Sequence, residues 1–402
     1  MNYICHVPLA GGFALGNMNV MGKPPLMITS FTPFESNDLL LRRYLEKKGY
    51  TIPYFQLDKL NGKLNELAEI ASRGIDFCSG IPPCSGLSMA SQLKPGARAT
   101  SPVNDWMYES ANFILEHIKP KVYCFENAPA LFTGAGEEVR KKIIGIGEKN
   151  GYSITFYKTN TLKHGIPQFR PRTFGLFLKG PNAPILNYYN RKSPHIIDYL
   201  KQIPANASLQ KEYACSEWDI TQFEIYKYLR KLYGENWRKV MTDYKPHSTT
   251  YEYLQRINML DDFQNWQKTL PDASEIVTKN IEHIKKKSAM GKGARINYRV
   301  LEIDKEYTYA VIGEMMGKQV HPIEDRLLNI REFCHLMGLP HDYDLEPKEY
   351  VKISQNVPVA TCTDMTTEIV EIIKGNRTLS SKSVYMQDNT KEYENKKTKS
   401  LF

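Results

Sequence analysis

Residues 75–86 read Ile-Asp-Phe-Cys-Ser-Gly-Ile-Pro-Pro-Cys-Ser-Gly, an apolar run followed by a turn that carries a thiol at Cys84. The apolar part predicts a buried parallel strand, and the prolines predict a stiff turn at its carboxyl end. In open α/β sheets, ligands bind at that edge. A lone cysteine is more often a small buried hydrophobe. A Pro-Pro-Cys turn at the exit of a strand instead favours Cys84 as a nucleophile.

The same alternation of strand and helix patterns extends from Asn2 to about Lys179 and predicts an α/β fold. A helix is predicted after Ser36 or Asn37, ending before Gly49, and a second from Glu137 to Lys149. The predicted strands are Thr51 to Leu57, Ile75 to Cys78, Lys121 to Phe125, Ser153 to Tyr157 and Phe174 to Leu178. Any doubly wound sheet has this rhythm, so it indicates a fold class and not an activity.

The chain divides into a discontinuous domain and an inserted one. From about Pro181 to Val320, tyrosine, lysine and asparagine become dense and apolar periodicity weakens. The α/β pattern resumes near Asp325 and closes with a helix from Met365 to Lys374. The predicted parts are residues 1–180, an insert at 181–320, a return at 321–375, and a polar tail at 376–402 that we expect to be disordered.

Composition limits the class of protein without choosing it. The 402 residues include 53 Lys and Arg against 44 acids, a net charge of +9 that is compatible with a polyanionic substrate. Seven cysteines occur singly with no Cys-x-x-Cys pair, so no metal site or disulfide framework is expected. Free thiols point to a reducing cytoplasm. No apolar run is long enough to span a bilayer, so no membrane partner is expected.

A carboxylate is expected at the same sheet edge as the thiol. Glu126 ends the apolar strand and is followed by Asn-Ala-Pro. Partial burial there would raise the pKa of Glu126 and make it a usable acid near neutrality. The alternative is an ordinary ion pair with a lysine or arginine.

Two arginines follow in the string Gly-Ile-Pro-Gln-Phe-Arg-Pro-Arg at residues 165–172. Arg170 and Arg172 alternate with apolar residues, so in extended backbone they face the same side. One is suited to hold an oxygen of a planar ligand, and the other to orient Glu126 or a phosphate. Arginines in such a segment are more often surface charge, and the sequence leaves their individual roles open.

These strings, in this order, resemble the DNA (cytosine-5) methyltransferase family of bacterial or phage type, from about Cys5 to about Lys374. The resemblance implies a Rossmann-like S-adenosyl-methionine-dependent sheet with an inserted, smaller target-recognition domain. It implies that Cys84 adds to C6 of a flipped cytosine, Glu126 assists at N3, and Arg170 and Arg172 serve the base and Glu126. S-adenosyl-L-methionine is the implied cofactor, and double-stranded DNA the partner of a monomer that uses no metal. The implied setting is DNA methylation in restriction–modification systems, with a paired restriction enzyme left open.

The cofactor loop departs from the family pattern Asp-x-Phe-x-Gly-x-Gly-Gly-Phe. The usual Asp, Phe and first Gly are Cys5, Val7 and Leu9 here. By resemblance, the cofactor-binding residues are Gly11, Gly12, Phe13, Glu35, Asp58, Asn356 and Val357. Glu35 is expected at the ribose hydroxyls, with Asp38 as its competitor, and Asp58 at the adenine amino group. The string Arg-Leu-Leu-Asn-Ile-Arg-Glu at 326–332 resembles family scaffolding.

Two other functions stay open. An RNA substrate is possible, as in the tRNA-directed branch of the family, but the Cys-Phe-Thr string of that branch is absent. A non-catalytic DNA-binding relative with a degraded cofactor loop is the second. Within the insert, Arg295, Asn297 and Arg299 alternate in a predicted strand and are candidates for reading base edges; a solvated basic face is the alternative.

Overall fold

The computed structural model describes residues 1–60, 62–83, 86–87, 100–204, 217–237, 239–240, 254, 258–270, 275–289, 306–312 and 319–390. The chain forms two compact units. The first comprises Met1–Leu209, Glu306–Val311 and Cys334–Phe402, and the second Gln210–Lys305 and Ile312–Phe333. The predicted boundary at residue 181 is therefore early, because the segment that follows it belongs to the first unit. That the second unit recognises the target remains a prediction.

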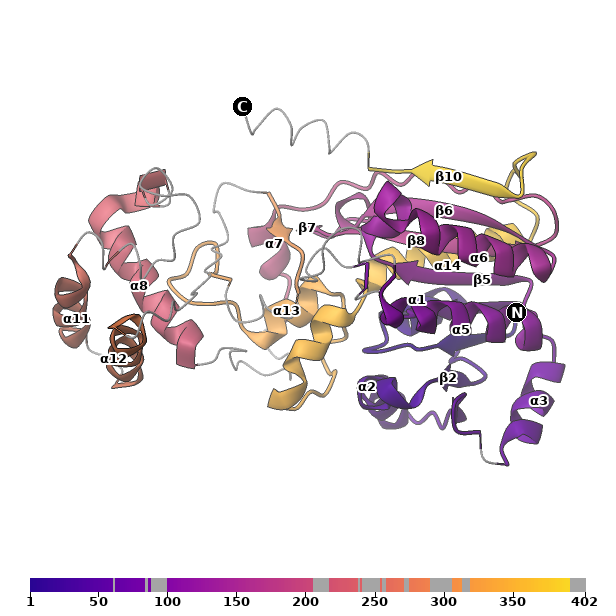
Figure 1. Ribbon diagram of the computed structural model, residues 1–402, viewed down its shortest axis with the longest axis horizontal. Helices are drawn as coiled ribbons and strands as arrows, with labels where there is room; N and C mark the ends of the chain where they lie inside the picture. Colours follow the sequence, from indigo (N-terminus) through magenta and orange to yellow (C-terminus); the bar gives the residue numbers. More distant parts are fainter. Residues whose placement is uncertain are drawn as a thin grey trace. The chain divides into compact units, whose positions relative to one another are not determined.

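An eight-stranded sheet organises the first unit (Figure 1). Its strand order is β10-β6-β8-β5-β4-β1-β2-β3. All neighbours are parallel except β8, which runs antiparallel to β5 and β6. The strands are β1 (Tyr3–His6), β2 (Ile28–Ser30), β3 (Tyr54–Gln56), β4 (Phe77–Gly80), β5 (Val122–Asn127), β6 (Tyr152–Asn160), β8 (Pro171–Lys179) and β10 (Val384–Asp388). The α/β prediction is confirmed, and each predicted strand overlaps an observed one.

Helices cover both faces of this sheet because alternate strand residues are apolar on both sides. On one face, α1 (Gly12–Met21), α2 (Glu35–Lys47) and α14 (Val359–Ile373) pack on residues such as Tyr3 and Val122. On the other, α3 (Leu64–Ser72), α5 (Asp105–Phe113) and α6 (Glu137–Lys149) pack on Ile4 and Tyr123. Helix α6 has the predicted bounds, with acidic residues in its first turn and Lys149 in its last, as the helix dipole favours. Two short helices, α7 (Ile196–Leu200) and α13 (Ile330–Leu336), follow later in the chain.

The prediction of a disordered tail is wrong for residues 376–390. Strand β10 pairs in parallel with β6, Val384 opposite Ile154 and Asp388 opposite Lys158. Arg377 ties this segment to α14 by donating from Nε and Nη2 to the fully buried carboxylate of Glu368, at 2.7 and 2.8 Å. Composition predicts disorder, but a buried charge pair with α14 and a ladder of backbone hydrogen bonds with β6 order the segment. Residues 391–402 lie outside the described part.

Most of the described part of the second unit is helical. It contains α8 (Glu217–Tyr233), α11 (Leu260–Lys268) and α12 (Glu275–Ala289), which share a core rich in aromatic side chains. Tyr228 packs against Phe263 and Trp266, with ring centroids 5.4 and 5.3 Å apart. The predicted strand with Arg295, Asn297 and Arg299 lies outside the described residues.

The predicted scaffolding string forms a local cap. Asn329 Oδ1 accepts from the Glu332 backbone N–H at 2.9 Å, and Glu332 Oε2 accepts from the Asn329 N–H at 2.9 Å. Arg326 donates to both carboxylate oxygens of Glu332, at 2.9 and 2.7 Å. A capping box of this kind fixes where a helix begins, here α13. In the first unit, β7 (Gln168–Phe169) pairs in parallel with β9 (Thr308–Tyr309).

Five of the seven cysteines lie in the described part of the chain. Cys5, Cys78, Cys124, Cys334 and Cys362 are free and buried, as the prediction of small core residues requires, whereas Cys84 and Cys215 lie outside the described residues. In the part of the chain that the structure describes, no helix combines the length and apolar character needed to cross a membrane.

Candidate active site

The carboxyl ends of β4 and β5 bring two of the predicted motifs together. The strands are neighbours, with Gly80 opposite Phe125, so the residues that follow leave the sheet side by side. Asn127 Nδ2 donates to the Pro82 carbonyl oxygen at 3.5 Å, which links the Glu-Asn string to the Pro-Pro turn. Cys84 itself lies outside the described residues, two positions beyond Pro82.

Glu126 is buried at this edge and paired with an arginine. Its side chain is 3% exposed, and its Oε1 lies 2.6 Å from Arg172 Nε. The contact is an ion pair and not a well-aligned hydrogen bond. Burial raises the pKa of the Glu126 carboxyl above its usual range, while the charges of Arg172 and Arg170 act in the opposite direction. The site therefore favours the protonated acid more than water does.

Arg170 has a different role from Arg172. Its side chain is almost fully buried, and it donates to three backbone carbonyl oxygens, those of Val311 at 2.5 Å and of Ser354 and Asn356 at 2.8 Å. These bonds hold the segment that precedes α14. Arg170 thus positions the predicted cofactor-side loop, and Arg172 is the arginine that touches Glu126.

The retained glycines let α1 approach that loop closely. Gly12 N donates to Asn356 Oδ1 at 2.6 Å, and a Cβ on Gly12 would lie 2.0 Å from the Val357 carbonyl oxygen. Gly11 precedes the helix with φ +88°, a left-handed conformation that suits glycine. A Cβ on Gly16 would lie 2.6 Å from the Cys362 Cβ. The structure therefore brings Gly11, Gly12, Asn356 and Val357 together.

The departures from the family pattern strain the loop before α1. Val7 and Leu9 have φ of 44° and 52°, and a β-branched residue such as Val7 rarely adopts that region. Asp38 Oδ1 accepts from the Leu9 N–H at 2.9 Å, and its Oδ2 accepts from Tyr54 OH at 3.1 Å. Burial raises the pKa of Asp38 to about 7. Asp38 therefore supports the loop.

The other predicted cofactor residues are more scattered. Glu35 is exposed at the start of α2, and Asp58 is exposed with its Oδ1 accepting from the Thr32 N–H at 2.9 Å. Phe13 lies in the core, edge-on to Phe174 with ring centroids 6.0 Å apart. Its ring is a packing group here and offers no free face.

Several buried polar atoms at this edge have no hydrogen-bond partner among the described residues, and two of them lie near the loop before α1 or the end of β2. They are Asn356 Nδ2, beside Gly12, and Thr32 Oγ1, just after β2. A buried polar group without a partner costs free energy, so such atoms mark places where a ligand can bind. The donor beside the start of α1 suits an anionic group such as a carboxylate. The residues present thus fit a ligand with a carboxylate at one end.

The sequence contains a signal for the structural role of Asp38, as distinct from a role at the ribose. It lies three and seven positions before Leu41 and Leu45, on the face of α2 that is buried, where a carboxylate needs partners. The Asn127 contact with Pro82 and the carbonyl partners of Arg170 had no such signal, because they join segments far apart in the chain.

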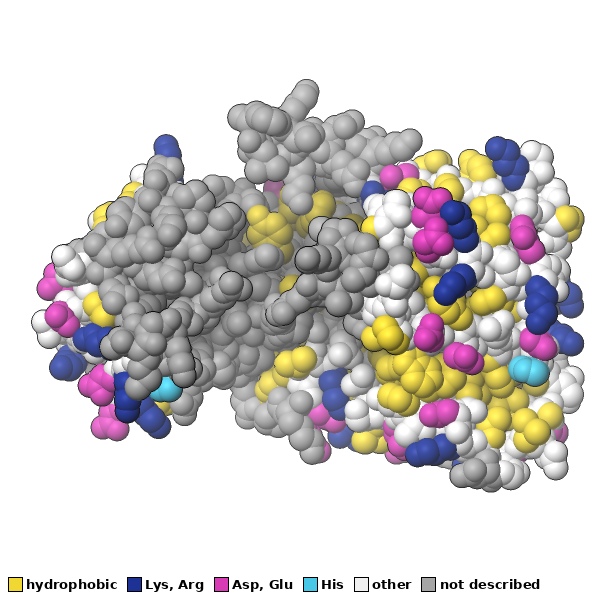
Figure 2. Space-filling view, viewed as in Figure 1, with side chains coloured by type: hydrophobic (Ala, Val, Ile, Leu, Met, Phe, Trp, Pro, Cys, Tyr) yellow, Lys and Arg dark blue, Asp and Glu magenta, His cyan; other side chains and the backbone are white. Residues whose placement is uncertain are grey.

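Neither metal-ligating clusters among the described residues nor the charge on the face shown in Figure 2 indicates a second site. No group of three or more His, Cys, Asp or Glu side chains is placed there to hold a metal ion. On the face shown in Figure 2, described Lys and Arg side chains are interspersed with acidic ones and do not gather in one patch.

Comparisons with known proteins agree with this architecture. The model of the C-5 cytosine-specific DNA methylase family matches residues 10–374. The type II methyltransferase M.XorII of Xanthomonas oryzae pv. oryzae is 30% identical over 118 residues, 29% of this chain and 27% of that protein. The type II methyltransferase M1.HphI of Haemophilus parahaemolyticus is 30% identical over 108 residues, 27% of this chain and 28% of that protein. The match thus spans little more than a quarter of each curated relative.

Solved structures share the fold over nearly the whole chain. The methyltransferase EhMeth of Entamoeba histolytica has a TM-score of 0.55 at 14% identity, covering 93% of this chain and 98% of that one. A putative DNA modification methyltransferase encoded within an E. coli prophage has a TM-score of 0.56 at 14% identity, covering 93% and 99%.

Proposed function

Since the chain belongs to the C-5 cytosine-specific DNA methylase family, we propose that it methylates C5 of a cytosine in double-stranded DNA through a covalent adduct between Cys84 and C6. The observation that carries the proposal is the pairing of buried Glu126 with Arg172, beside the turn that leads to Cys84. A nucleophile and an acid at neighbouring strand ends are what addition to a pyrimidine ring requires.

The reaction begins with the thiolate of Cys84. Its sulfur forms a bond to C6, which breaks the aromaticity of the ring and leaves an electron pair available at C5. When bound, S-adenosyl-L-methionine would supply an electrophilic methyl group for the electron pair at C5, and its sulfur would keep the electrons of the broken S–CH3 bond as a neutral thioether. After C5 has gained the methyl group, a base, which we take to be water, removes the C5 proton. The electrons of that C–H bond restore the ring, and the Cys84–C6 bond breaks.

Glu126 lowers the cost of the addition step. Negative charge develops on the ring as sulfur adds, and a protonated Glu126 relieves it by donating to N3. Burial, which raises the pKa of Glu126, keeps that proton on the carboxyl to higher pH. Arg172 fixes the direction of the carboxyl through its contact with Oε1.

The cofactor site is proposed at the start of α1. Gly11, Gly12, Asn356 and Val357 form its close-packed wall, and the unpartnered Asn356 Nδ2 is a donor for the methionine carboxylate. Thr32 Oγ1, Asp58 and Glu35 lie after β2 and β3, at the same sheet edge, and are the candidates for the ribose and adenine. Arg170 holds the Asn356 loop in place by bonding its carbonyl oxygens.

Access to C6 requires that the target base leave the duplex, because stacking hides that atom. We propose that the second unit selects the sequence in which this happens, since the catalytic residues meet only the flipped cytosine. Arg295, Asn297 and Arg299 remain the candidate readers.

A covalent trap tests the proposal. With 5-fluorocytosine in the duplex, the last proton cannot be removed, so the enzyme should stay bonded to DNA in denaturant. The complex should require both S-adenosyl-L-methionine and Cys84. Cys84→Ala should abolish methyl transfer and leave cofactor affinity, measured by calorimetry, within a few-fold of wild type. Methyl transfer that persists in Cys84→Ala contradicts the proposed nucleophile.

Two measurements separate the alternatives. Tritium transfer from labelled cofactor into total DNA and total tRNA distinguishes a DNA from an RNA substrate. Absence of cofactor binding favours a non-catalytic relative. We also propose that the protein is a monomer. We propose a reducing cytoplasm as its compartment, because the mechanism needs a free Cys84 thiol and the five described cysteines are not bridged.

A further inference from the structure

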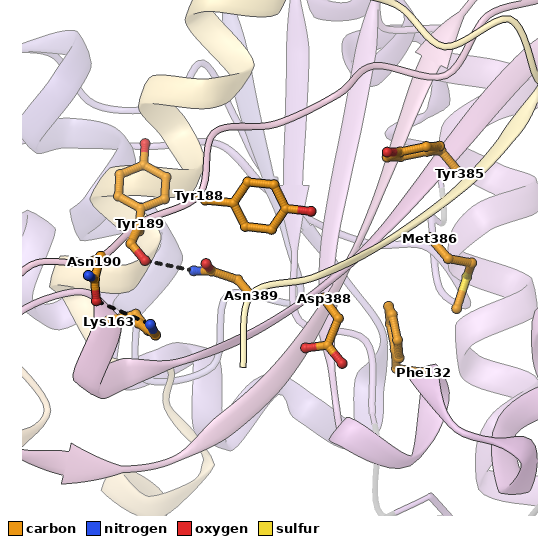
Figure 3. Close-up of a pocket in the computed structure, with 9 residues that line it drawn as sticks. All are labelled: Phe132, Lys163, Tyr188, Tyr189, Asn190, Tyr385, Met386, Asp388 and Asn389. Carbon is orange, nitrogen blue, oxygen red and sulfur yellow. Dashed lines mark hydrogen bonds between the residues drawn. The ribbon is translucent and has the colours of Figure 1, made fainter. Parts of the chain in front are cut away.

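A pocket of about 810 Å³ opens on the first unit, and none of its lining residues belongs to α1 (Figure 3). Its walls include Phe132, Lys163, Tyr188, Tyr385, Asp388 and Asn389. A volume of this order is typical of sites that take a small organic ligand.

The segment that carries β10 completes this pocket. Tyr385, Asp388 and Asn389 come from it, and they lie beyond residue 374, where the match to the family model ends. Part of the pocket wall therefore lies outside the family match, and Glu126 does not line the pocket.

Aromatic rings in the pocket are available for stacking. Tyr188 is 64% exposed, and neither it nor Tyr385 packs on another aromatic ring among the described residues. In Figure 3 the Tyr188 ring projects into the middle of the pocket, with Tyr189 on one side and Tyr385 on the other. An exposed ring of this kind stacks on planar ligands, and every nucleobase has a face suited to it.

Polar atoms with fixed directions lie beside these rings. Asn389 Nδ2 donates to Thr159 Oγ1 and to the Tyr189 carbonyl oxygen, both at 3.2 Å, so its Oδ1 is the atom left to accept from a ligand. Lys163 Nζ donates to Asn190 Oδ1 at 3.1 Å, which leaves Asn190 Nδ2 as a donor. A base edge, which carries donors and acceptors together, matches this mixture.

The negative charge of Asp388 in the pocket wall is balanced by neighbouring residues. The carboxylate of Asp388 lies 3.6 Å from Lys158 Nζ, and its Oδ1 already accepts from the Thr390 N–H and hydroxyl. With Asp388 balanced in this way, its carboxylate opposes a nearby phosphate less than an unpaired carboxylate would.

The pocket lies on the same sheet edge as Glu126. Asn127 is opposite Thr173, Thr173 opposite Lys158, and Lys158 opposite Asp388. Three strand spacings separate Asn127 from Asp388, roughly 14 Å. A DNA strand held near Glu126 would span this distance with a few nucleotides.

We propose that this pocket binds a nucleobase, as an unstacked base of the DNA on which the enzyme acts. The proposal rests on the proposed function for the identity of that DNA. A free nucleotide has the same chemistry, so the test includes both sources.

Photocrosslinking with the full-length protein tests the proposal directly. A single strand of a dozen nucleotides, carrying one 5-iodouracil, is irradiated with the protein, and the adduct is located by peptide mass spectrometry. We expect adducts at Tyr188 or Tyr385. Tyr188→Leu and Tyr385→Leu, which keep apolar bulk but remove the ring, should each weaken oligonucleotide binding by roughly five- to one-hundred-fold. Tyr50→Leu, which changes a 36% exposed tyrosine elsewhere, is the matched control and should bind like wild type.

Competition with dCMP or dAMP separates the two sources. Displacement of the strand only by other strands supports a base within DNA, whereas displacement by the mononucleotide at similar concentration supports a free nucleotide. Adducts confined to other regions, or unchanged binding in both leucine variants, overturn the proposal. Methyl transfer to duplex DNA is measured in parallel. If the wild type transfers no methyl group but still forms adducts in the pocket, the proposed function is refuted and the pocket proposal stands.

Discussion

Replacing Gly12 by alanine tests whether α1 needs its close approach to the loop before α14. The added Cβ would lie 2.0 Å from the Val357 carbonyl oxygen and 2.5 Å from Asn356 Oδ1. Ordinary contact begins at 3.4 Å, so the helix or the loop must move by about 1.4 Å. Such a shift also breaks the 2.6 Å bond from Gly12 N to Asn356 Oδ1.

Two effects contribute to the expected loss in the free energy of unfolding. Overpacking a tight contact costs about 1–3 kcal/mol, and the lost hydrogen bond about 1 kcal/mol. A total of about 2–4 kcal/mol lowers the Tm of a domain of this size by roughly 5–15 °C. Because the displaced wall belongs to the proposed cofactor site, affinity for S-adenosyl-L-methionine should fall as well.

Gly145→Ala is the matched control, measured by the same thermal unfolding followed by circular dichroism. Gly145 is exposed within α6, and its added Cβ would meet nothing within 4 Å. Alanine there should stabilise the helix by about 0.5–1 kcal/mol. If Gly12→Ala and Gly145→Ala shift the Tm equally and in the same direction, the close contact does not constrain α1.

Three further substitutions address the acid, the loop and the ordered tail. Glu126→Gln should slow methyl transfer by roughly 10²–10⁴-fold. The rate of the wild type should fall as the pH rises through the raised pKa of Glu126, and the variant should lack that fall. The exposed Glu66→Gln should show neither effect, and equal rates in the two variants would refute the acid role. Burial raises the pKa of Asp38 from 3.8 to about 7, so the folded protein binds this proton more tightly than the unfolded chain, and its free energy of unfolding should fall as the pH rises from 4 to 7. In urea unfolding, Asp38→Asn should lack this part of the pH dependence. The same pH dependence in both proteins would count against the raised pKa of Asp38. Arg377→Ala leaves buried Glu368 without its counter-charge and should cost about 3–5 kcal/mol, whereas Lys374→Ala, in an exposed pair, should cost under about 1 kcal/mol; similar losses in both would show that burial does not strengthen the Arg377 pair.

Local sequence predicted the elements whose signals are local. Helix α6 begins and ends at the predicted residues because acids lie in its first turn and a glycine follows its last. Apolar runs between turn residues predict strands that overlap β3, β4, β5, β6 and β8. Helix α14 begins at Val359, six residues before the predicted Met365, because its first turns carry threonines that weaken the apolar pattern.

Long-range contacts account for what the sequence did not predict. Strand β10 reads Val-Tyr-Met-Gln-Asp within a polar segment, and its order depends on pairing with β6 and on Glu368. The same holds for the arginines. Their spacing indicated one partner face, but the carbonyl oxygens that Arg170 binds come from residues 311, 354 and 356. No local pattern carries that information.

The pairing of β10 with β6 sets a schedule for biosynthesis. Val384 pairs with Ile154, so all residues between them must be translated before this edge of the sheet can close. At ordinary rates of elongation that interval lasts on the order of ten to fifty seconds. Throughout it, β6 presents an unpaired edge rich in aromatic and β-branched residues, the kind of surface to which other nascent chains add. The yield of native protein in a cell is therefore expected to depend on chaperone capacity and on translation speed over the second half of the message.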